Sequence, residues 1–125
     1  MSARKRTANP VTFDTVREIA RVLPGIEEGT CYGTPALRVR GKLLSRLKED
    51  GETLVVKIDF DTRDVLLQAH PDTYFITDHY AGYPYVLVRL AKVSCDDLAK
   101  LLEDSWRQAA PKRLVAEYDR ASASS

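Results

Sequence analysis

The chain has 125 residues, and 19 lysines and arginines against 18 aspartates and glutamates leave a net charge of +1. This balance excludes a protein drawn to nucleic acid or membrane by overall charge, so any such partner must meet a local patch. The length fits one domain, and 44% apolar residues are enough for a core without stabilising disulfides.

The first predicted element is an amphipathic helix over residues 12–23, with Thr12 as its N-cap and Pro24-Gly25 as its end. Residues 27–30 are polar, and we interpret them as a connection. The apolar residues of the helix recur on one face: Phe13, Val16, Ile19, Ala20 and Leu23.

An antiparallel meander follows, with strands of alternating polarity predicted over 36–40, 43–48 and 53–59. Asp50-Gly51 gives the strongest hairpin signal in the chain. A further strand is predicted over 73–77 and another over 85–92. We expect the helices to cover these side chains of the sheet: Leu37, Val39, Leu43, Leu47, Leu54, Val56, Ile58, Val86, Val88 and Leu90.

Three more helices are predicted. A short one over 62–69 has Asp61 as its cap and Val65 and Leu66 facing inward. A long one begins after Ser94, and a further short helix follows Pro111. The long helix carries a stripe at helical spacing: Leu98, Leu101, Leu102, Ser105, Trp106 and Ala109.

This order of elements predicts an α+β fold, a two-layer sandwich in which helices pack on one face of an antiparallel sheet. We expect a basic flexible tail over 1–10, a single domain over 11–118 and a flexible tail over 119–125. Cys31 and Cys95 are interpreted as reduced thiols of a cytoplasmic protein, with no metal and no cofactor. No apolar run of about 18 residues predicts a membrane span.

The open face of the predicted sheet is basic, with Asp59 as the one acid among its strand positions. Such a face could bind phosphates of a nucleic acid, with Lys42 at the hairpin end adding a contact. The alternative is an ordinary solvated face, because outward Lys and Arg also protect sheet edges from pairing. Its cations are Arg38, Arg40, Arg46, Lys48, Lys57 and Arg89.

Residues 76–85 form a polar loop that is rich in tyrosine. Tyr80 and Tyr83 are candidates for stacking on bases, although tyrosines more often pack with their hydroxyls bonded. Asp78 and His79 define an alternative, a small-ligand or enzymatic pocket in this loop. No serine or cysteine nucleophile is placed by a motif, and a protein-interaction module is a third alternative.

The chain also resembles the MmcQ/YjbR family over roughly residues 12–116. The segments that carry the resemblance are 23–29 (LPGIEEG), 32–36 (YGTPA), 39–42 (VRGK), 54–57 (LVVK), 103–106 (EDSW) and 111–113 (PKR), in this order. The resemblance implies a fold similar to that of CyaY (frataxin) and a DNA-binding role, but no catalytic residues. The loop at residues 77–80 replaces a tryptophan-bearing loop of many members.

We therefore predict a non-enzymatic protein that binds nucleic acid, with DNA as the candidate partner, and leave its oligomeric state open. The predicted contacts are Arg38, Arg40, Lys42, Arg46, Lys57 and Arg89 for phosphates and Tyr80 and Tyr83 for bases.

Overall fold

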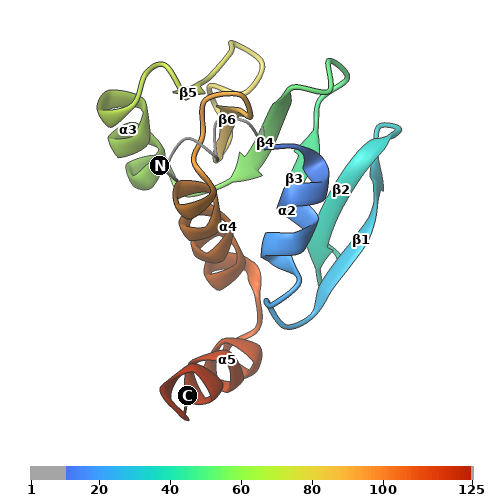
Figure 1. Ribbon diagram of the computed structural model, residues 1–125. Helices are drawn as coiled ribbons and strands as arrows, with labels where there is room; N and C mark the ends of the chain where they lie inside the picture. Colours follow the sequence, from blue (N-terminus) through green and yellow to red (C-terminus); the bar gives the residue numbers. More distant parts are fainter. Residues whose placement is uncertain (1–10, 125) are drawn as a thin grey trace, which may run out of the picture.

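A computed structural model describes residues 11–124, and their helices and strands follow one another as Figure 1 shows. The predicted tail over 1–10 lies outside these residues. In chain order the elements are α2 (Phe13–Ala20), β1 (Ile26–Cys31), β2 (Thr34–Val39), β3 (Lys42–Leu47), β4 (Thr53–Lys57), α3 (Phe60–Ala69), β5 (Tyr74–Phe75), β6 (Tyr85–Arg89), α4 (Cys95–Ala109) and α5 (Lys112–Ser124).

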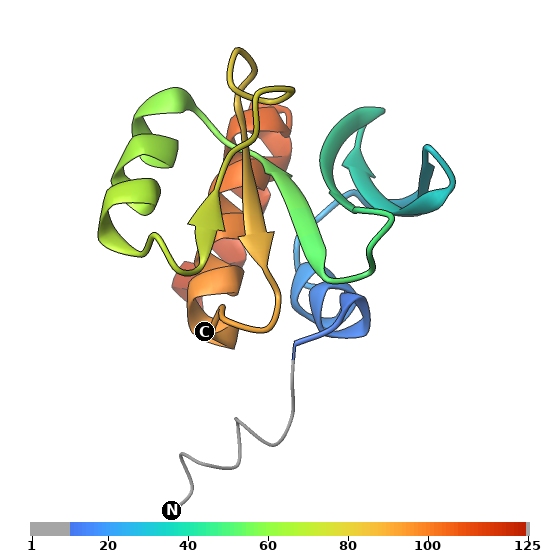
Figure 2. The ribbon, with the colours of Figure 1, turned by 90° about the horizontal axis from the view of Figure 1, so that it is seen from above.

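The six strands form one antiparallel sheet in the order β1-β2-β3-β4-β6-β5. Helices α2 and α4 lie on one side of this sheet, and α3 stands beside its β5 edge (Figure 1). The other side, called here the open face, carries none of the helices of residues 11–124 (Figure 2). The predicted α+β class is confirmed, while the likeness to CyaY stays a prediction.

Helix α4 supplies the centre of the core. All six residues of its predicted stripe are buried, and Trp106 is fully buried with its Nε1–H donating to the Pro24 carbonyl at 2.8 Å. The Ser94 hydroxyl accepts from the Asp97 backbone N–H, which confirms the predicted cap. This helix therefore joins the sheet to the turn that ends α2.

A β-bulge in β3 changes one predicted side-chain direction. Leu37 pairs with Ser45 but Arg38 pairs with Leu43, so that Leu44 is an extra residue between the two pairs. Leu44 packs in the core with Val39 and Trp106, and Leu43 turns to the open face. The expectation that Leu43 faces the helices was therefore wrong, because strict alternation does not hold across a bulge.

Two further expectations were wrong in detail. Residues 27–30 lie in strand β1, which the sequence concealed because an exposed edge strand needs no apolar alternation. Helix α3 begins two residues early, with Asp59 rather than Asp61 as its N-cap, and the Asp59 carboxylate also accepts from Gln108 of α4. Asp59 thus leaves the open face.

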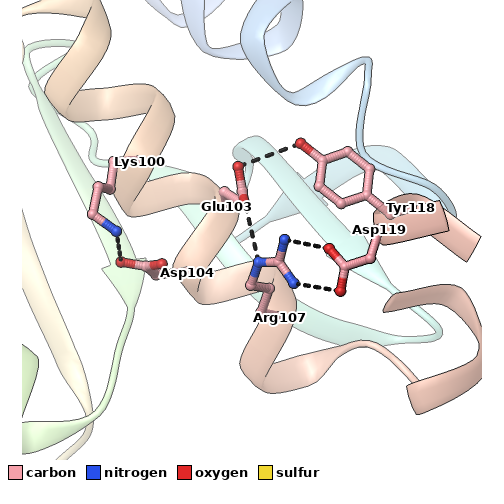
Figure 3. A network of polar contacts seen from close by, with 6 residues as sticks. All are labelled: Lys100, Glu103, Asp104, Arg107, Tyr118 and Asp119. Carbon is pink, nitrogen blue, oxygen red and sulfur yellow. Dashed lines mark hydrogen bonds and ion pairs between the residues drawn. The ribbon is translucent and has the colours of Figure 1, made fainter. Parts of the chain in front are cut away.

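Polar contacts join α5 to α4 (Figure 3). Arg107 of α4 forms an ion pair with Asp119 of α5 at 2.7 Å and another with Glu103 at 2.9 Å. The Tyr118 hydroxyl donates to Glu103 at 3.3 Å. Helix α5 thus continues over residues 119–124, where the sequence analysis expected a tail.

Neither Cys31 nor Cys95 is in a disulfide. Among the helices of residues 11–124, none combines the length and the apolar character that a membrane crossing requires.

We expect Trp106→Phe to lower the free energy of unfolding by about 1–3 kcal/mol, since the Pro24 carbonyl loses its donor and a cavity opens. Urea denaturation measures the change. Tyr118→Phe removes one half-buried hydroxyl from the same helix pair and should cost much less. An equal loss of unfolding free energy in both variants would show that the hydrogen bond and packing of Trp106 contribute no more than the Tyr118 hydroxyl.

Candidate binding site on the open face

The strand register places five cations on the open face, because residues paired across an antiparallel ladder point to the same side. Arg46 pairs with Val55, Lys57 with Tyr85 and Arg89 with Thr53. Arg38 pairs with Leu43, and Lys48 continues the alternation beyond Leu47. The five are Arg38, Arg46, Lys48, Lys57 and Arg89.

The two other predicted cations lie elsewhere. Arg40 is in the turn between β2 and β3, beyond the last pair of strand residues. Lys42 pairs with Val39, and Val39 is part of the core on the helix side. Their roles in binding stay predictions, but the structure does not group them with the other five.

The open face is hollowed by a cavity of about 370 Å³. In Figure 2 the 76–84 loop and the curved strands β2 and β3 rise on either side of β4. Val55 forms part of the cavity wall and is itself buried. The residues that line the cavity are Cys31, Tyr32, Leu43, Arg46, Val55, His79, Tyr80, Tyr83 and Tyr85. The cavity is thus mainly aromatic, with one guanidinium.

Arg46 is the charged group of this cavity, and its side chain is only 7% exposed. Its Nη1 donates to the Thr34 hydroxyl at 3.1 Å and lies 3.6 Å from the Glu49 carboxylate. Its Cζ is 5.2 Å from the centre of the Tyr32 ring. Its Nε is buried and has no hydrogen-bond partner among the described residues. A buried donor without a partner is costly, so this atom is a candidate for ligand contact.

The charge states of Arg46 and Tyr85 are fixed near neutral pH. Burial alone would lower the pKa of Arg46, but the nearby Tyr80 hydroxyl and the Glu49 carboxylate together raise it above its usual value. Burial raises the pKa of Tyr85, and the neighbouring Tyr80 adds to the increase. Arg46 is therefore a permanent cation beside a neutral phenol.

Tyr32 has an unusual backbone for its position. It is 83% exposed, and its φ of 54° lies in the left-handed region, which bulky residues avoid. Gly33 follows with φ of 79°, so the two residues form the type I′ turn between β1 and β2. A large exposed ring in a strained position suggests a use other than folding.

Arg63 of α3 positions the loop that forms one wall of the cavity. It is buried, and its guanidinium donates to the carbonyls of Tyr80, Ala81, Tyr83 and Tyr85 at 2.9–3.3 Å. The role of Arg63 was not predicted, and the expectation that Val65 faces inward was wrong, because Val65 is 64% exposed. Arg63 gave no signal in the sequence, because it stands between Thr62 and Asp64 and its partners are distant backbone carbonyls.

The structure separates Asp78 from His79, the two residues of the alternative site. The His79 ring lines the cavity and packs edge-on against Tyr80 at 4.7 Å between centroids. Asp78 is exposed and is not among the lining residues. Tyr80 and Tyr83, the predicted stacking residues, both line the cavity.

These features define an α+β protein whose open sheet face holds an aromatic pocket with a single buried arginine. The YjbR family model matches residues 21–108, and the chain therefore belongs to the YjbR family, as its sequence motifs indicated.

The similar proteins carry no stated function. Uncharacterized proteins of Mycobacterium bovis and Mycobacterium tuberculosis are 39% identical over 69 residues, which is 54% of this chain and 54% of each relative. The chain thus spans about half the length of these curated relatives. A crystal structure of a Deinococcus radiodurans protein with a DUF419 domain is similar at a TM-score of 0.66 and 25% identity, covering 77% of this chain and 76% of that one.

We expect Arg63→Lys to loosen the 76–84 loop, because one ammonium cannot span four carbonyls. Amide hydrogen exchange should become faster at Tyr83 and Tyr85, and the free energy of unfolding should fall by about 1–3 kcal/mol. Arg38→Lys is the control, since Arg38 forms no hydrogen bond with other residues of 11–124. Unchanged exchange at Tyr83 in Arg63→Lys would refute this role.

We expect Tyr32→Asn to keep or raise stability, because Asn-Gly is the preferred pair for a type I′ turn. Tyr32→Val should lose about 1–2 kcal/mol, since a β-branched residue tolerates positive φ poorly. Thermal unfolding compares the two variants. Equal losses in both would mean that the ring, not the backbone, sets the stability of this turn.

Proposed function

We propose that the protein binds nucleic acid through the open face of its sheet. The observation that supports this most is the difference in charge pairing between the two sides. Every cation of α2 and α4 has an acidic partner: Arg17 pairs with Asp14 and Glu28, Lys100 with Asp104, and Arg107 with Glu103 and Asp119.

The cations of the open face are mostly unpaired. Among the described residues, Arg46 has one weak ion pair with Glu49, and the other four have no acid within ion-pair distance. The single acid that shares their face in the strand register is Glu27, and its carboxylate accepts from the Gly41 backbone N–H. Unpaired cations are free to neutralise phosphates, and this releases the counterions that are condensed on the nucleic acid.

Aromatic rings lie beside three of these cations, one of which is Arg46 near the Tyr32 ring. The Arg89 guanidinium is 4.1 Å from the centre of the Phe75 ring, and Lys48 Nζ is 5.8 Å from that of Tyr80. Tyr32 and Tyr83 are exposed at the rim of the cavity. Positive charge mixed with exposed aromatic rings is the composition that single-strand binding surfaces use.

Binding should therefore depend steeply on salt. Four phosphate contacts to a single strand, one for each unpaired cation of the open face, would give a log–log slope of about −2.8, at about 0.7 per contact. Fluorescence anisotropy with labelled single-stranded and duplex DNA across a salt series measures this slope.

Two lysines of the same sheet provide the matched test. We expect Lys57→Ala to weaken binding and to reduce the slope by about 0.7 on a single strand. Lys42→Ala removes the same charge on the helix side and should change binding less. No binding near 50 mM salt, or equal effects of the two variants, would overturn the proposal of a binding face.

A further inference from the structure

The aromatic cavity on the open face presents donors that the protein itself does not use. We propose that the protein binds a single strand and that one unpaired guanine of that strand enters this cavity, where Arg46 donates to its O6 and N7. This inference rests on the proposed nucleic-acid binding and specifies what the same face recognises.

The shape of the cavity selects a base over a duplex. Its volume of about 370 Å³ is near the lower end for small-ligand sites and fits one flat ring system. Its walls come from Tyr32 on one side and from Tyr80 and Tyr83 on the other. A stacked, paired base is out of reach for such a site, whereas a base splayed from a single strand can stack on these rings.

The donors of Arg46 select the kind of base. Its Nη1 donates to the Thr34 hydroxyl and to the Leu47 carbonyl, while its Nε has no partner in residues 11–124. Nε–H and Nη2–H form one edge of the planar guanidinium, and this edge suits two adjacent acceptors. O6 and N7 of guanine form such a pair, and their contact with arginine is the commonest specific one to a base.

The charge of the cavity favours a neutral base over a phosphate. Arg46 is its one cation, and Glu49 at 3.6 Å already offsets part of that charge. A phosphate that entered the cavity would lose its hydration among the tyrosine rings. It would gain only an arginine whose charge Glu49 partly offsets, so its burial there would be costly. Phosphates are better placed on Lys48, Lys57 and Arg89, which lie on the same face and are half-buried or exposed.

The first experiment changes the ligand and leaves the protein intact. Anisotropy would compare labelled ten-residue oligothymidylates that carry one central guanine, inosine, 7-deazaguanine, adenine or abasic nucleotide. We expect guanine and inosine, which both keep O6 and N7, to bind at least about fivefold more tightly than the others, as a bidentate base contact allows. Equal, salt-dependent binding of all five strands would refute the guanine pocket and leave the proposed function standing.

Protein variants then locate the contact. Arg46→Lys keeps the charge but loses the two-pronged geometry of the guanidinium, and should reduce the preference for guanine over adenine while the salt slope remains. Because Arg46 is buried and this variant could unfold, Tyr32→Asn provides a second test in a turn that Asn suits. We expect it to fold normally and to weaken binding of the guanine strand by about fivefold or more, as for a lost stacking ring. An unchanged preference for guanine in a folded Arg46→Lys would refute the role of Arg46, and unchanged binding in Tyr32→Asn that of the Tyr32 ring.

A third measurement does not depend on strand binding. Cys31 lines the cavity, whereas Cys95 is exposed at the start of α4. In Cys95→Ser, millimolar guanosine should slow maleimide labelling of Cys31, and ribose 5-phosphate should not. Protection by ribose 5-phosphate alone would identify the cavity as a phosphate site and overturn the proposal. Protection by guanosine in a protein that binds no strand would retain the pocket and reject the nucleic-acid function.

Discussion

A single extra residue in β3 determines which side chains of this strand enter the core and which lie on the open face. In strict alternation Leu44 and Arg46 would point to the same side of the sheet, so that either a leucine would be exposed or an arginine would enter the core. The bulge at Leu44 turns this leucine toward Trp106 and leaves Arg46 on the open face. Both layers of the protein depend on this change of register.

Charge is divided between the two sides of the sheet. On the helix side, Arg17 and Arg107 each contact two carboxylates, and these pairs join α2 to β1 and α4 to α5. Exposed pairs of this kind contribute little stability individually, so their main effect is to leave that side neutral. On the open face, by contrast, only Arg46 has an ion pair among the described residues.

Strained and rigid segments meet at the cavity. The Tyr32 ring is exposed at the rim of the cavity, and its backbone lies in the left-handed region. On the opposite side, the 76–84 loop has little regular structure, yet Arg63 binds the carbonyls of three of its residues and that of the adjoining Tyr85. A pocket whose walls are held before ligand arrives loses less entropy on binding.

The sequence by itself determined the elements whose signals are local. The stripe of α4, the Ser94 cap, the Asp-Gly hairpin and the basic character of the open face all follow from spacing and residue type within a few neighbours. These signals were enough for the α+β class and for most of the residues that the helices cover. They also singled out Tyr80, Tyr83 and His79 in one loop, without showing what they face.

Only the tertiary structure decided the features that depend on distant partners. Strand β1 is polar and is recognisable only by its pairing with β2, and the bulge at Leu44 is visible only against Arg38 and Leu37. Arg63 and Arg46 owe their positions to backbone carbonyls, a hydroxyl and rings far along the chain. Periodicity reports which side of an element is apolar, but not which polar groups meet across the fold, because those contacts are set by how the elements pack.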